Sequence, residues 1–146
     1  MNSAYRSIHQ TPDIATYQAL RQQAGLSPKS HEAAAMGLPN SLFSVQILQG
    51  ETPVGMGRVI GDGGCFFQVV DIAVLPAHQG QGLGKRIMAE IMSYLREAVP
   101  PSGYVSLIAD GQAKELYTQY GFKETAPRSV GMALPVQKSA NPATEA

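Results

Sequence analysis

Three glycines at alternate positions, Gly80, Gly82 and Gly84, lead directly into a long amphipathic segment. Glycine costs backbone entropy, so a cluster at the start of a helix indicates that another molecule approaches the backbone closely. An anion is the usual ligand, because a helix N-terminus offers free amides and the positive end of the helix dipole. The segment Leu75–Met88 therefore predicts an anion-binding loop that connects a strand to a helix.

The residues around this loop have the matching periodicities. Apolar residues at helical spacing predict a helix from Leu83 to the stop at Pro100. An almost continuous apolar run predicts a strand over Cys65–Leu75 that is covered on both faces. Further helices are expected within Thr11–Gly25 (with Thr11 as its cap), Pro28–Met36 and Gly111–Phe122, and further strands over Tyr5–His9, Ser41–Leu48, Val54–Gly61, Tyr104–Ala109 and Ser129–Leu134.

An antiparallel meander followed by strand–helix–strand–helix–strand predicts a mixed α+β sheet with helices on its faces. The 146 residues fit one domain with an adequate core, and no repeat or domain boundary is visible. We expect residues 1–136 to form that domain. Residues 137–146 lack core formers and are expected to be a flexible tail.

Composition excludes several classes of partner. Lys and Arg (11) balance Asp and Glu (11), which argues against nucleic acid. Cys65 is the only cysteine, so no intrachain disulfide forms and a reducing compartment is expected. The N-terminus lacks the apolar core of a signal peptide, and the longest apolar run is too short for a membrane span. These features predict a cytoplasmic protein without a membrane partner, and no residue spacing suggests a metal site.

Two common phosphate-binding loops do not fit the glycine segment. A Walker loop that ends at Gly84-Lys85 requires glycine and a hydroxyl where this chain has Gln79 and Arg86. A dinucleotide-binding fingerprint requires its last glycine where the chain has Lys85 or Ile87. The anion is therefore expected to be held by a different kind of loop.

The segment Gln79–Gly84 fits the pattern Gln/Arg-x-x-Gly-x-Gly/Ala, and here the chain resembles the GCN5-related N-acetyltransferase superfamily. In that family the segment holds the pyrophosphate of acetyl-coenzyme A. The stretch Leu116–Phe122, "LYTQYGF", is similar to the second signature of the family. The resemblance covers Ser41–Leu134 and implies a mostly antiparallel sheet of six to seven strands with helices on both faces. It also implies direct acetyl transfer to a primary amine, with acetyl-coenzyme A and the amine as partners.

The resemblance assigns roles to individual residues. The strand Ile72–Val74 would pair with the pantetheine arm, and one of its amides would polarise the thioester carbonyl. Tyr117 matches the tyrosine that faces the sulfur and would stabilise or protonate the leaving thiolate. Asp110 would lie near the coenzyme arm, with a loop-capping role as the alternative. The complete expected coenzyme-binding set is Ile72, Ala73, Val74, Gln79, Gly80, Gln81, Gly82, Leu83, Gly84, Lys85, Asp110 and Tyr117.

Two other residues each have two interpretations. Asp71 is a carboxylate in an apolar run, and it is either a catalytic base, acting directly or through water, or a structural hydrogen-bond acceptor. Arg58 either faces the acceptor or forms a structural salt bridge. Cys65 is expected to be packed rather than nucleophilic.

The acceptor amine is expected between Thr11–Met36 and Lys123–Val130, but the sequence does not identify it. Arylalkylamines and other small amines, amino-sugars, antibiotics and proteins remain open, as does the oligomeric state, a homodimer included. The alternative function is a non-catalytic acyl-coenzyme A sensor or interaction module on the same fold. Tyr117 favours the enzyme, because a sensor needs no proton donor at the sulfur.

Overall fold

The computed structural model describes residues 4–136. In chain order the strands and helices are β1 (Tyr5–Ile8), α1 (Ile14–Gln23), α2 (His31–Gly37), β2 (Phe43–Gln49), β3 (Thr52–Gly61), β4 (Phe66–Val74), α3 (Leu83–Ala98), β5 (Tyr104–Ser106) and α4 (Lys114–Thr118). Short 3₁₀ helices cover Leu38–Asn40, Pro76–His78 and Gly111–Ala113.

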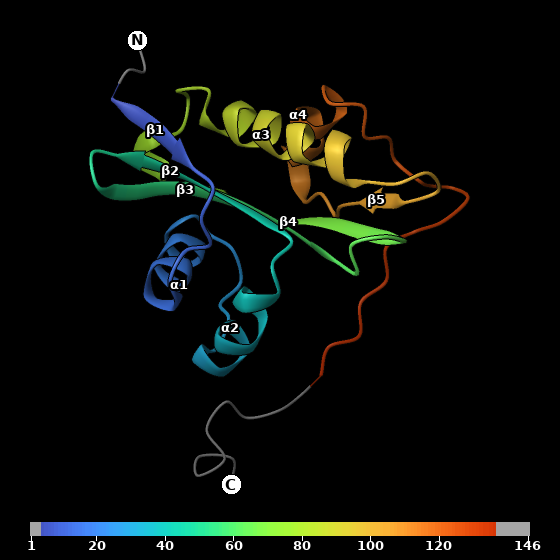
Figure 1. The fold of residues 1–146 in the computed structure, drawn as a ribbon, viewed down its shortest axis with the longest axis horizontal. Coiled ribbons are helices and arrows are strands. Elements are labelled where there is room, and N and C mark those ends of the chain that lie inside the picture. The colour runs from blue at the N-terminus through green and yellow to red at the C-terminus, as the bar shows by residue number, and fades with distance from the viewer. Residues whose placement is uncertain (1–3, 137–146) are drawn as a thin grey trace, which may run out of the picture.

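The five strands form one sheet in chain order, β1-β2-β3-β4-β5. Neighbouring strands are antiparallel from β1 to β4, whereas β4 and β5 are parallel. Figure 1 shows α3 and α4 on one face of the sheet and α1 and α2 on the other. The mixed α+β class with helices on both faces is therefore confirmed.

Helix α3 covers its face of the sheet through apolar residues at the predicted helical spacing. Its buried side chains are Leu83, Ile87, Met88, Ile91 and Leu95. Gly57 of β3 lies directly beneath it: a Cβ at this position would be 2.6 Å from Ile87 Cγ2 and 2.8 Å from Ile72 Cδ1. No side chain fits there, so the helix and the sheet approach each other closely at Gly57.

The opposite face of the sheet carries a second, smaller core beneath α1. Tyr17 and Leu20 of α1 are buried there together with Met56 of β3 and Ala73 of β4. Ala73 is the residue before Val74, the last residue of β4. The smaller core therefore packs against the end of the strand that precedes the glycine loop.

A bulge in β4 determines the direction of the Asp71 side chain. Asp71 and Ile72 both lie opposite the single residue Gly57 of β3, and Asp71 has a φ of 61°. Strict alternation from Val69, which packs in the core under α3, would direct Asp71 into that apolar core. The extra residue reverses the alternation, so Ile72 points to α3 and Asp71 to α1.

The expectation of six to seven strands is wrong, because the described residues form five. The strand predicted over Ser129–Leu134 is absent, and these residues are irregular chain. The alternating pattern that predicts a strand is local, whereas a strand also needs a neighbour that accepts its hydrogen bonds. Within residues 4–136, this segment has no strand beside it.

The first helix begins later than predicted. Asp13, not Thr11, is the N-cap of α1, and its carboxylate accepts a hydrogen bond of 2.8 Å from the Thr16 amide. The Thr11 hydroxyl instead lies 2.9 Å from the Ser44 hydroxyl of β2, so it fixes the chain to the sheet before the helix starts. The predicted tail, 137–146, lies outside the described residues, and the single domain over 1–136 stays a prediction.

Candidate active site

The loop between β4 and α3 ends in a helix start that has no side-chain cap. Gly82 is the N-cap residue of α3 with a φ of 77°, and Gly80 has a φ of 79°. Both angles lie in the left-handed region that favours glycine. The first-turn amides of an α-helix have no intrahelical acceptor, and a Cβ at either glycine would meet nothing within 4 Å. The start of α3 is thus suited to bind an anion such as a pyrophosphate.

Two hydrogen bonds fix this helix start relative to its neighbours. Gln79 Nε2 donates to the Val74 carbonyl at 3.1 Å, which ties the loop to the end of β4. The Tyr120 hydroxyl donates to the Lys85 carbonyl at 2.9 Å, which ties the chain after α4 to the first turn of α3. The helix that carries Tyr117 is therefore held beside the glycine loop.

Strands β4 and β5 pair over only three residue pairs, from Phe66 with Tyr104 to Gln68 with Ser106. Farther along β4, Ala73 and Val74 pair with β3, and no strand within residues 4–136 pairs with their other edge. A strand edge of this kind can pair with an extended ligand arm. This edge leads directly into the glycine loop, as the resemblance requires of Ile72–Val74.

Asp71 lies in a buried cluster of opposite charges, with its side chain 4% exposed. Arg58 Nε donates to Asp71 Oδ2 at 2.8 Å, and Arg21 Nη1 donates to Oδ1. The Tyr17 hydroxyl lies 3.1 Å from Oδ1 and 3.0 Å from Oδ2. Two cations and a hydroxyl compensate for the burial of this carboxylate. The arrangement favours the structural alternative for Asp71, and it shows that Arg58 forms a salt bridge.

Tyr17 and Arg21 were not predicted as partners of Asp71. Burial, followed by the negative charge of Asp71, raises the pKa of Tyr17, so the hydroxyl keeps its proton and donates it. A signal was present in the sequence: Tyr17, Leu20 and Arg21 fall on one face of the helix. A charged residue on an otherwise buried stripe indicates a buried partner of opposite charge.

Tyr117 is half-buried in α4, with its ring in edge contact with Phe122 (centroids 6.4 Å apart). Burial and the negative charge of Asp110 raise the pKa of the Tyr117 hydroxyl. The group is therefore protonated at neutral pH and can donate. The capping alternative for Asp110 is wrong, because its side chain makes no capping hydrogen bond at Gly111–Ala113.

The remaining polar residues offer little chemistry. Cys65 is exposed, so the expectation that it is packed is wrong; it lies in the turn before β4, where its amide donates to Asp62 at 2.9 Å.

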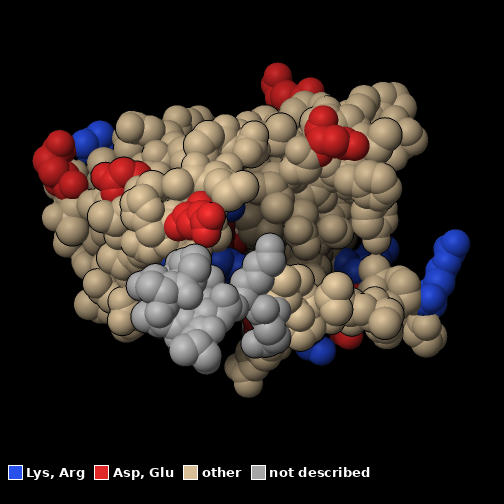
Figure 2. Space-filling model, turned by 90° about the horizontal axis from the view of Figure 1, so that it is seen from below, with Lys and Arg blue, Asp and Glu red and all other residues tan. Residues whose placement is uncertain are grey.

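Among residues 4–136 no cluster of His, Cys, Asp and Glu is arranged to hold a metal ion. The helices of that same range are too short or too polar to cross a membrane. Figure 2 shows one face of the molecule with scattered charges and no continuous basic surface.

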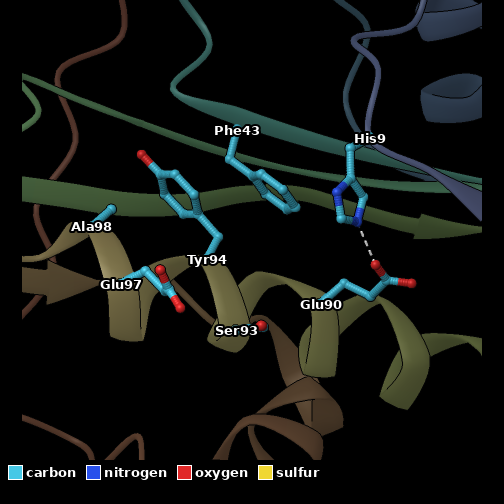
Figure 3. Close-up of a pocket in the computed structure, with 7 residues that line it drawn as sticks. All are labelled: His9, Phe43, Glu90, Ser93, Tyr94, Glu97 and Ala98. Atoms are coloured by element: carbon cyan, nitrogen blue, oxygen red, sulfur yellow. Dashed lines mark hydrogen bonds and ion pairs between the residues drawn. The ribbon is translucent and has the colours of Figure 1, made fainter.

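A separate cavity of about 390 Å³ lies between β2 and the second half of α3. Phe43 stacks on Tyr94 there, with ring centroids 4.8 Å apart, and His9 forms a hydrogen bond with Glu90 (Figure 3). None of the residues lining this cavity belongs to the expected coenzyme-binding set. The cavity is therefore distinct from the candidate site.

Comparison with known protein families identifies the family of the domain. Residues 40–124 match the model of the acetyltransferase (GNAT) domain, and this range contains β4, the glycine loop, α3 and α4. The chain belongs to the GNAT acetyltransferase family. The GNAT assignment confirms the resemblance seen in the sequence. The individual site residues stay predictions.

Several GNAT proteins are similar over much of the chain. A solved structure from meticillin-resistant Staphylococcus aureus, described as a probable acetyltransferase of unknown function, is 49% identical with a TM-score of 0.86 and covers 90% of this chain and 99% of its own. Histone acetyltransferase TAP1 of Glycine max is 29% identical over 131 residues, which are 82% of this chain and 56% of that protein. An uncharacterized ycf52-like N-acetyltransferase of Prochlorococcus marinus is 30% identical over 118 residues, 77% of this chain and 63% of that protein. The chain thus spans about three fifths of these two curated relatives.

Proposed function

We propose that this chain is an acetyl-coenzyme A-dependent N-acetyltransferase that transfers acetyl directly to a primary amine. The observation that carries the proposal is the start of α3, which has no side-chain cap, is joined to the unpaired edge of β4 by residues 75–82, and lies beside the helix of Tyr117. Acetyl-coenzyme A would supply a thioester whose carbonyl carbon is the electrophile. The chain's own residues bind, orient and donate protons around it.

Each part of the site has one task in this proposal. The first-turn amides of α3, with the loop Gln79–Gly84, hold the pyrophosphate. The backbone of Ile72–Val74 pairs with the pantetheine arm, and one of its amides donates to the carbonyl oxygen as negative charge develops there. The Tyr117 hydroxyl donates a proton to the sulfur as the carbon–sulfur bond breaks. The attacking amine loses its proton to water, and Asp71 keeps its structural role.

The acceptor is proposed to bind between Thr11–Met36 and Lys123–Val130. A screen of amines for coenzyme A release would identify its class, with the free thiol detected by a thiol reagent. Since Cys65 is exposed, the screen uses the Cys65→Ser variant, so that the only reactive thiol is the product. If acetyl-coenzyme A binds tightly but none of the amines tested causes release of coenzyme A, the result would favour the non-catalytic sensor.

Acetyl-coenzyme A should stabilise the fold. At about one hundred times its dissociation constant it should add about 2.7 kcal/mol to the free energy of unfolding, which raises Tm by roughly 5–10 °C. Nicotinamide dinucleotides and ATP should raise Tm much less, because only the coenzyme also has an arm that pairs with β4. Thermal melts with each ligand test this. An equal shift with ATP would contradict the assignment of the site.

Tyr117→Phe should lower kcat by about 10²-fold while the KM for acetyl-coenzyme A stays nearly unchanged. Only the hydroxyl is removed, so binding is retained and the leaving thiolate loses its proton donor. Tyr94→Phe is the matched control, because burial also raises the pKa of Tyr94 but this residue lines the separate cavity. Steady-state kinetics on both variants test this prediction. Equal kcat values for Tyr117→Phe and Tyr94→Phe would show that Tyr117 is not the acid.

A further inference from the structure

The buried charges beneath α1 do not balance. The cluster contains the guanidinium groups of Arg21 and Arg58 but a single carboxylate, that of Asp71, and all three side chains are buried. The Tyr17 hydroxyl keeps its proton and adds no negative charge, and the charged groups that act on its pKa are these same three residues. The cluster therefore has an excess of one positive charge, although buried charges are normally paired.

One hydrogen-bond donor of the cluster has no partner in the described chain. Each of the three guanidinium nitrogens of Arg21 donates to a neighbour. Arg58 donates through Nε to Asp71 and through Nη1 to the Ser41 hydroxyl at 2.6 Å, but its Nη2 donates to no atom of residues 4–136. Within that range no enclosed side-chain nitrogen or oxygen lacks a partner. Arg58 Nη2 is therefore not enclosed, and another molecule can reach it.

This donor lies on the side of the sheet where the acceptor is proposed to bind. Arg58 of β3 pairs with Val70 of β4. Met56, two residues earlier in β3 and on the same face, pairs with Ala73. Alternate residues of a strand are about 7 Å apart, so Arg58 lies within the length of a small molecule from the strand end Ile72–Val74. Figure 2 looks onto the side of α1 and α2 and shows blue and red atoms inside a hollow of this face.

We propose that the acceptor amine carries a carboxylate, which accepts a hydrogen bond from Arg58 Nη2 and neutralises the cluster. The inference rests on the proposed N-acetyltransferase function and names its substrate class, amino acids and related amines with one carboxylate. A carboxylate supplies the single negative charge that the cluster lacks, whereas a phosphate monoester carries more than one at neutral pH. Because Asp71 and Ser41 hold the guanidinium in place before the acceptor binds, little entropy is lost on binding.

Matched pairs of amines test the required charge. The acids β-alanine, γ-aminobutyrate and ε-aminocaproate are each compared with the corresponding carboxamide, which keeps the amine and the chain length but is neutral at the other end. At least one acid should have a kcat/KM about tenfold or more above that of its carboxamide, because hydrogen bonds between charged groups are the stronger ones. If the carboxamides are acetylated as well as the acids, or if aminoethyl phosphate is preferred to every acid, the carboxylate is not recognised. Either result overturns this inference and leaves the proposed acetyl transfer standing.

Three arginine variants show whether Arg58 is the source of the preference. Arg58→Gln should abolish the preference for acids while the KM for acetyl-coenzyme A stays unchanged. Arg58→Lys keeps the charge and can still pair with Asp71, so it should restore part of the preference. Arg6→Gln is the matched control, because Arg6 also pairs with a carboxylate but lies on β1 with its side chain 52% exposed. A preference for acids that survives in Arg58→Gln would place the carboxylate elsewhere and overturn the proposal.

The NMR signal of the Arg58 Nε–H group gives a second measurement that needs no turnover, and it also applies if Arg58→Gln does not fold. The signal is assigned by its loss in Arg58→Lys. It should move when an acid of the panel is added to the protein with coenzyme A and should stay in place with the carboxamide. A shift without acetylation of any amine would support the carboxylate site and contradict the proposed function. If no acid moves the signal, the carboxylate site is absent, even where neutral amines are acetylated.

Discussion

Asp71→Ala should lower the free energy of unfolding by about 3–5 kcal/mol. The change removes the carboxylate that Arg21 and Arg58 share, and each of these residues is 7% exposed. Two guanidinium groups of like charge would then remain buried beside the Tyr17 hydroxyl without their acceptor. Chemical denaturation followed by circular dichroism measures the loss.

Two variants make this expectation specific. Glu51→Ala breaks the Arg6–Glu51 ion pair, in which the glutamate side chain is 90% exposed, and it should cost about 0–1 kcal/mol. Comparable losses for the buried and the exposed pair would show that the Asp71 cluster contributes little to stability.

Asp71→Asn keeps the shape of the side chain but removes its charge. An Asp71→Asn protein of normal stability with its kcat abolished would instead make Asp71 the base.

Gly82→Val should weaken acetyl-coenzyme A binding by about 10²-fold or more. Position 82 has a φ of 77°, which a β-branched residue adopts only under strain, and the side chain would enter the open space in front of the first-turn amides. Either effect displaces the amides from the phosphate oxygens. Isothermal titration calorimetry measures the change in affinity.

Gly50→Val is the control for backbone strain alone. Gly50 also has a positive φ, 61°, with nothing within 4 Å of a Cβ, but it lies in the turn between β2 and β3. This variant should lose stability and bind acetyl-coenzyme A normally. A folded Gly82→Val protein with unchanged affinity would show that the loop serves only to begin α3.

The parts of the fold that local patterns encode could be predicted from the sequence. The apolar spacing from Leu83 predicts α3 almost to the residue, and the glycines mark its start. The same holds for β4, because a strand covered on both faces needs an unbroken apolar run. In both cases the signal lies within the element itself.

Features that depend on distant partners could not be predicted. The surroundings of Asp71 require a bulge that alternation does not reveal and an arginine from α1, fifty residues away in the chain. The strand predicted at Ser129–Leu134 has the correct pattern, but a pattern does not supply the neighbour that a strand needs. The strand predicted over Tyr104–Ala109 likewise ends early, at Ser106, because its pairing with β4 stops at Gln68.

The close contact at Gly57 links the start of α3, where we propose that acetyl-coenzyme A binds, to the bulged part of β4. Gly57 lies opposite the two bulged residues, Asp71 and Ile72, and it also packs against Ile87, one turn after the start of α3. The distance from the start of α3, the proposed anion-binding site, to the bulged strand therefore depends on the absence of a single methyl group at position 57. In a chain with alanine at this position α3 would have to move away from the sheet, and the proposed coenzyme-binding loop would move with it.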